Sequence, residues 1–107
     1  MPEDASDRHR AKLDPLGAAI LDGAGVLPAA TRRAAANDDG VPEPFTAYVR
    51  TIHRGAYRIT DATVAGLGEA GADDDAIFEI SVSAAYGAAR ARLDAGLAAL
   101  RGARDQA

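Results

Sequence analysis

The sequence predicts an all-α fold, in which one small domain of about five helices ends in a long C-terminal helix and packs as a homo-oligomer. Apolar residues recur at helical spacing in several segments, and no segment has the alternation typical of a strand. Capping residues and Gly or Pro stop signals separate these segments from one another. The length of 107 residues suits a single domain.

The first helix is predicted over residues 15–22. Asp14 is placed to cap it, Pro15 suits its first helical position, and Gly23 ends it. Residues 1–12 have no apolar periodicity and are expected to form a flexible tail, which leaves 13–107 as the helical domain.

Two further helices follow. One opens at Pro28 and ends at the turn residues 37–40. The next begins between Pro42 and Pro44 and runs to about residue 55 or 57. Its apolar residues form one stripe at positions i, i+3, i+4, i+7 and i+11, namely Phe45, Tyr48, Val49, Ile52 and Ala56. Its opposite side carries Arg50, Arg54 and Arg58, each four residues from the next.

A fourth helix is capped by Thr60 or Asp61 and ends before Gly71, which has the position of a left-handed C-terminal residue. The last helix starts after Asp73 or Asp74 and extends to about residue 102. It has two apolar faces, separated by a narrow polar strip through Glu79, Ser83, Arg90 and Asp94. Two apolar faces need two packing partners, so one of them is expected to contact another subunit.

The amino-acid composition also favours self-association. Only five residues are aromatic, three Tyr and two Phe, and alanine dominates the apolar content. A domain of this size buries roughly two-thirds of the surface of its unfolded chain. A core built from such small side chains is therefore thin unless a second copy of the chain covers it.

Charge and composition exclude several classes of function. The net charge of −4 opposes a nucleic-acid partner, because phosphate binding needs clustered Lys and Arg in surplus. No segment resembles a signal peptide or is long and apolar enough for a membrane span, so a cytoplasmic location is expected. The chain has no cysteine, which excludes disulfides and thiolate chemistry. No metal or other cofactor is expected, because the run Asp73-Asp74-Asp75 lacks the alternating ligands and the glycine of a calcium loop.

Residues 48–100 resemble the carboxymuconolactone decarboxylase and alkylhydroperoxidase D-like superfamily. The resemblance rests on Ala56-Tyr57-Arg58-Ile59-Thr60-Asp61, on Ala70-Gly71, on Asp74-Asp75-Ala76-Ile77-Phe78-Glu79-Ile80 and on Ala84-Ala85-Tyr86-Gly87. These segments cover about half of the chain. The resemblance implies an all-α homo-oligomer, often a trimer or hexamer, with active sites near the subunit contacts.

The peroxidase branch of this superfamily carries a Cys-x-x-Cys-x-x-x-His motif before the short helix. Counted back from Gly71 without gaps, the two cysteines and the histidine fall on Ala56, Ile59 and Thr63. None of these side chains can act as a thiolate nucleophile, so thiol peroxidase activity is excluded. The histidine motif of the decarboxylase branch is also unmatched at this place.

Six residues are candidates for a ligand site. His53 is the proposed proton carrier, with Tyr57 or Glu79 assisting, and Arg50 or Arg54 is the proposed anion anchor. Tyr86 is a candidate hydrogen-bonding residue, because in the implied fold the long helix lines the pocket. Each has a plainer interpretation: His53 as a partly buried histidine satisfied by a neighbour, and the arginines as a solvated helix face.

The leading functional hypothesis is a Cys-less member of this superfamily that binds a small, anionic organic molecule. If it is an enzyme, it uses acid–base chemistry of the lyase or isomerase type. The alternative is a non-catalytic homo-oligomer that serves interaction or scaffolding. Convergence of His53, Tyr57 and an arginine on one enclosed cavity would favour the first hypothesis over the second.

Overall fold

The computed structural model describes residues 5–106, and it describes side chains from Arg8 onward. Its elements are α1 (Ala5–Asp22), α2 (Ala29–Asn37), α3 (Thr46–Gly55), the 3-10 helix η1 (Ala56–Arg58), α4 (Asp61–Glu69) and α5 (Asp74–Asp105). No strand occurs in residues 5–106. The predicted all-α class, the five α-helices and the long last helix are therefore confirmed, whereas packing as a homo-oligomer stays a prediction.

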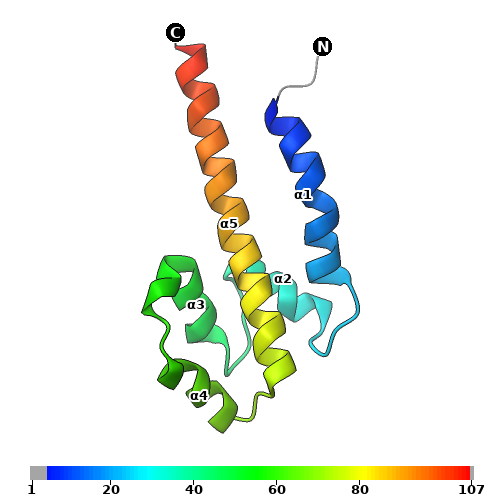
Figure 1. Cartoon of the computed structure of the whole chain (residues 1–107), viewed down its shortest axis with the longest axis vertical. Helices are drawn as coiled ribbons and strands as arrows, with labels where there is room; N and C mark the ends of the chain where they lie inside the picture. The colour runs from blue at the N-terminus through cyan, green and yellow to red at the C-terminus, as the bar shows by residue number, and fades with distance from the viewer. Residues whose placement is uncertain (1–4, 107) are drawn as a thin grey trace.

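Helix α5 is the spine of the molecule and contacts each of the other four α-helices. Its first half packs against α2, α3 and α4, while its second half extends away from them alongside α1 (Figure 1). The chain therefore consists of a packed lower part and a two-helix arm, in which the start of α1 and the end of α5 lie at the same end of the molecule (Figure 1).

The core lies in the packed part, where α2 and α3 meet the first half of α5. Val49 of α3 and Ile80 of α5 are fully buried at its centre. The other core residues are mostly small or come from the predicted stripe of α3, and include Ala35, Phe45, Tyr48, Ile52, Leu67 and Ala84. The stripe prediction thus holds from Phe45 to Ile52. It fails at Ala56, which is exposed because α3 ends at Gly55 and the chain tightens into η1.

Local sequence signals correctly predicted where α4 and α5 begin and where α4 ends. The Thr60 side chain accepts a hydrogen bond from the amide of Thr63 and caps α4. Asp73 caps α5 by accepting from the amide of Ala76 at 2.8 Å. Gly71 has a positive φ of 103°, as its position after α4 predicted.

The start of the first helix differs from the prediction. The helix begins at Ala5 rather than near residue 15, and Pro15 lies inside it. Residues 5–12 are therefore helical, and residues 1–4 of the predicted tail lie outside the described residues. The added turns rest on α5, where Arg10 pairs with Asp94 at 3.3 Å. Such tertiary contacts outweigh the weak local preference of this segment.

The polar strip predicted on the last helix is also wrong at one position. Ser83 is fully buried, and its hydroxyl has no hydrogen-bond partner among the described residues. It faces the core because α2 covers this side of α5. The two apolar faces are buried unequally: Ala84 and Ala88 are buried, whereas Ala91 and Ala95 farther along the same face are exposed and Phe78 on the adjoining face is 68% exposed.

Candidate functional site

Three arginines from α3 and η1 lie along the outward side of α3, opposite the core. The i+4 spacing of Arg50 and Arg54 keeps them on one side of α3, because four residues make little more than one helical turn, whereas Arg58 lies in η1 beyond the end of α3. Together with Thr46, Ala47, Thr51 and Glu43 they line an open depression of about 370 Å³. We call these seven residues the arginine face.

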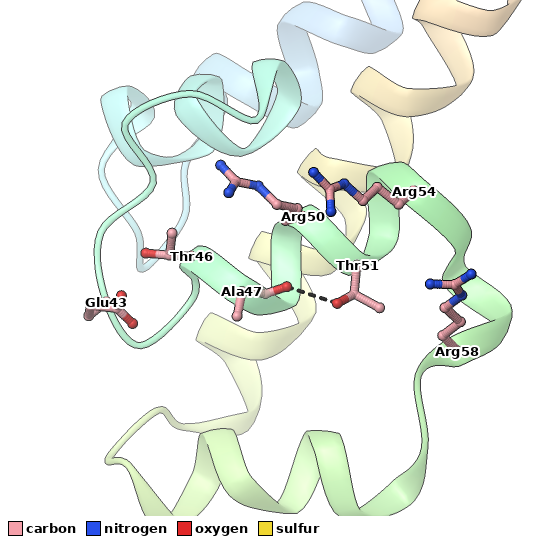
Figure 2. Close-up of a pocket in the computed structure, with 7 residues that line it drawn as sticks. All are labelled: Glu43, Thr46, Ala47, Arg50, Thr51, Arg54 and Arg58. Carbon is pink, nitrogen blue, oxygen red and sulfur yellow. Dashed lines mark hydrogen bonds between the residues drawn. The ribbon is translucent and has the colours of Figure 1, made fainter.

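The side chains of the arginine face come from three successive segments of the chain (Figure 2). Arg50 and Arg54 point the same way from adjacent turns of α3, Arg58 lies beyond the end of that helix, and Glu43 lies on the loop before it (Figure 2). Three positive charges thus meet one negative charge in this depression, within a chain whose net charge is −4.

The arginines differ in how far their charge is already neutralised. Arg50 lies 3.6 Å from a carboxylate oxygen of Asp38, which is a long ion pair. Arg58 donates to the hydroxyl of Tyr57 at 3.3 Å and lies 5.6 Å from the centre of that ring. Neither Arg54 nor Arg58 forms an ion pair with a described residue. The face therefore retains positive charge that an anion can neutralise.

His53 lines a different depression. This depression, of about 420 Å³, lies between α2, α3 and α5, and its lining includes Asn37, Tyr86, Arg90 and Asp94. The Nε2 of His53 donates to the carbonyl oxygen of Ala35 at 2.8 Å, which ties α3 to α2. This contact fits the plainer interpretation of His53 as a histidine satisfied by a neighbour.

Tyr86 and Arg90 belong to a hydrogen-bond network between α5 and α1. Arg90 donates to the Tyr86 hydroxyl at 3.0 Å and to a carboxylate oxygen of Asp14 at 3.0 Å. It also lies 3.7 Å from a carboxylate oxygen of Asp94, four residues later on the same helix. The hydrogen bonds from Arg90 to Asp14 and to Tyr86 raise its pKa above the ordinary value. These groups are engaged with one another and hold the arm together.

Glu79 binds the loop between α1 and α2 through its carboxylate. Its carboxylate accepts hydrogen bonds from the backbone amides of Val26 at 2.7 Å and Leu27 at 3.0 Å. These two hydrogen bonds lower the pKa of Glu79 below its ordinary value. The carboxylate is therefore ionised at neutral pH and can accept, but not donate, a proton there.

The six candidate residues do not converge on one cavity. His53 and Tyr86 share the depression between α2, α3 and α5, and Arg50 and Arg54 share the arginine face. Glu79 lies at the α1–α2 loop, and the Tyr57 side chain is 84% exposed beside Arg58. Sequence reasoning did not select Glu43, Thr46 and Thr51 as site residues. Thr46 lies four residues before Arg50, which is a signal that could have found it.

Comparison of the chain with models of known protein families, with curated proteins and with solved structures gave no match. The resemblance to the carboxymuconolactone decarboxylase-like proteins therefore remains a prediction from the residues. Within the part of the chain that the structure describes, no three acidic or histidine side chains are grouped so that they could hold a metal ion. None of the helices in residues 5–106 is both long and apolar enough to cross a membrane.

Proposed function

We propose that this chain binds a small anionic organic molecule at the arginine face. The observation that carries the proposal is the alignment of three guanidinium groups on one open depression, with no described carboxylate paired to Arg54 or Arg58. A carboxylate or phosphate can accept two parallel hydrogen bonds from a guanidinium group. The adjacent turns that carry Arg50 and Arg54 allow one anion to contact both (Figure 2).

The hydroxyl groups beside the arginines add no free hydrogen-bond donor for an anion. Thr46 and Thr51 line the depression, although each hydroxyl already donates to a backbone carbonyl, to Val41 at 2.6 Å and to Ala47 at 2.9 Å. These bonds hold the hydroxyl oxygens in place as neutral parts of the surface. Most of the charge that a ligand meets there comes from the arginines.

The proposal concerns binding rather than catalysis. Lyase- or isomerase-type chemistry needs an acid or base beside the bound anion. None of the three side chains predicted for this task, His53, Tyr57 and Glu79, lines the arginine face. Tyr57 comes nearest through its contact with Arg58. A thiol peroxidase reaction is excluded, because the chain has no cysteine.

The test replaces both central arginines and measures anion binding directly. Acetate and inorganic phosphate are titrated into the labelled protein at constant ionic strength, and the amide signals of residues 46–58 are followed by NMR. The Arg50→Gln/Arg54→Gln variant should weaken binding of both anions at least tenfold, because charge-assisted hydrogen bonds contribute about 1.5–3 kcal/mol each.

The control for this experiment is Arg104→Gln, which removes a positive charge at the exposed end of α5. It should leave the affinity for both anions unchanged. Equal binding by the double variant and the unaltered chain would contradict the proposal, as would signal changes confined to residues outside the arginine face.

A second candidate function is self-association, as the composition predicted. The observation that favours it is the apolar surface of the arm: Leu16 of α1 is 51% exposed and Leu100 of α5 is 48% exposed. A hollow of about 350 Å³ on the same arm is lined mainly by apolar side chains, including Leu13, Leu16, Ala89 and Leu93. The mass of the chain in solution is the measurement that tests this candidate.

A further inference from the structure

A groove between α3 and α4 borders the arginine face and is much less charged. Its volume is about 280 Å³, and its lining consists of Pro44, Ala47, Tyr48, Thr51, Thr63, Gly66, Leu67 and Ala70. No Arg, Lys, Asp or Glu is among these residues. We call this depression the α3–α4 groove.

The arginine face and the α3–α4 groove are continuous. Ala47 and Thr51, one turn apart on α3, line both depressions. Their small side chains form a low boundary between the guanidinium groups and the groove. A molecule bound to Arg50 or Arg54 by an anionic group can therefore extend over this boundary toward α4.

Gly66 keeps the groove open on the α4 side. A Cβ atom built at this position meets no other atom within 4 Å, so the space above it is empty. Gly66 lies in the interior of α4, where glycine is less favourable than alanine. A larger residue would favour the helix, and its side chain would occupy the groove.

We infer that the ligand of this site is amphiphilic: a small carboxylate or phosphate whose uncharged apolar portion lies in the α3–α4 groove. This inference rests on the proposed function, since the arginines supply the charge that orients such a molecule. The apolar lining from Leu67, Ala70 and Ala47 supplies the contact for the remainder. Charge at one end and apolar surface at the other select amphiphiles over purely polar anions.

The experiment compares acetate, butyrate and hexanoate by NMR titration at constant ionic strength. The affinity should rise at least about twofold for each added methylene, because complete burial of one methylene contributes about fourfold and the groove is open to solvent. The added signal changes with chain length should occur in residues 63–70, while those of residues 46–58 should be common to all three probes.

Two leucine substitutions in α4 distinguish the effect of filling the groove from the effect of replacing a glycine in that helix. Gly66→Leu should fill the groove and remove the gain from acetate to hexanoate while leaving acetate binding intact. Gly68→Leu is the matched control, because Gly68 also lies in α4 above empty space but does not line the groove. It should leave the response to all three probes unchanged.

The outcomes distinguish this inference from the proposed function. Equal affinity for acetate and hexanoate, or a chain-length gain that survives in Gly66→Leu, would overturn the amphiphile inference and leave anion binding standing. Signal changes that hexanoate causes at Leu13 and Leu93 in place of residues 63–70 would also overturn it, because the apolar contact would then lie in the hollow on the arm. An affinity for acetate that is the same in the Arg50→Gln/Arg54→Gln variant and in the unaltered chain would contradict the proposed function itself.

Discussion

Single polar residues connect segments that are far apart in this chain. The carboxylate of Glu79 in α5 holds two amides of the loop at Val26 and Leu27, more than fifty residues earlier. The imidazole of His53 holds the carbonyl of Ala35 in the same manner. Both side chains form hydrogen bonds with backbone groups of distant segments, and the Ala35 carbonyl also accepts a hydrogen bond from the Asp38 amide. Their roles are structural.

The lowered pKa of Glu79 predicts a specific dependence of stability on pH. A carboxyl group whose pKa is lower in the folded chain than in the unfolded chain stabilises the fold at pH values above its ordinary pKa of 4.5. This contribution is lost as the pH falls below 4.5 and through the lower pKa of the folded state. The free energy of unfolding should therefore fall more steeply with acid in the unaltered chain than in Glu79→Gln.

Urea denaturation between pH 7 and pH 3 measures this difference. Glu69→Gln is the matched control, since Glu69 ends α4 in an exposed position and should behave like the unaltered chain. Parallel pH profiles for Glu79→Gln and the unaltered chain would show that the carboxylate does not hold the loop.

At the scale of elements, the backbones of α2 and α5 approach closely where Gly87 meets Ala36. A methyl group at Gly87 would overlap the backbone carbonyl of Ala36, so only glycine permits this approach. Ala35 and Ala84 are fully buried at the same interface. Small side chains at the crossing let the two backbones come together, and they also explain how a chain with few bulky residues forms a core.

Gly87→Ala should destabilise the fold by about 1–3 kcal/mol, because the backbones of α2 and α5 must separate. Gly96→Ala lies on the same helix where an added Cβ meets no atom within 4 Å, and it should stabilise α5 by about 0.5–1 kcal/mol. Thermal unfolding followed by circular dichroism at 222 nm compares the two. Equal stability changes in both variants would contradict the close crossing.

For the whole molecule, the arm is the feature that most needs explanation. The radius of gyration is 16.1 Å, against about 13 Å for a compact chain of this length. The longest extent is 53 Å, along α5, whose last turns are exposed. The arm therefore exposes apolar side chains that no other part of the described chain covers. We expect a second copy of the chain to pack against them.

Self-association through the arm predicts a larger mass in solution than the 11.0 kDa of one chain. Leu16→Asp should shift the mass measured by light scattering toward that of a single chain, because it puts a charge at the apolar hollow. Ala18→Asp is the control, since Ala18 is exposed on α1 but does not line the hollow. A single chain at all concentrations would exclude self-association.

The sequence by itself determined the features that depend on residues close together in the chain. The helix caps and the left-handed Gly71 need only one turn of neighbours. Gly71 was predicted correctly, and the structure selects Thr60 over Asp61 and Asp73 over Asp74 among the predicted caps. The shared side of Arg50 and Arg54 follows from helical spacing alone, whereas Arg58 lies in η1 beyond the end of α3 and reaches the same depression only through the fold.

Only the tertiary structure decided what depends on residues far apart. Residues 5–12 of α1 have no apolar periodicity, and the ion pairs of Arg10 and Asp14 join α1 to residues of α5 more than seventy positions away. Likewise, Ser83 is fully buried although the sequence placed it on the polar strip, and the imidazole of His53 donates a hydrogen bond to the carbonyl of Ala35 in α2 instead of lining the arginine face. Helical periodicity predicts which residues lie on the same side of a helix. Which of these sides is buried depends on how helices that are distant in the sequence pack against one another.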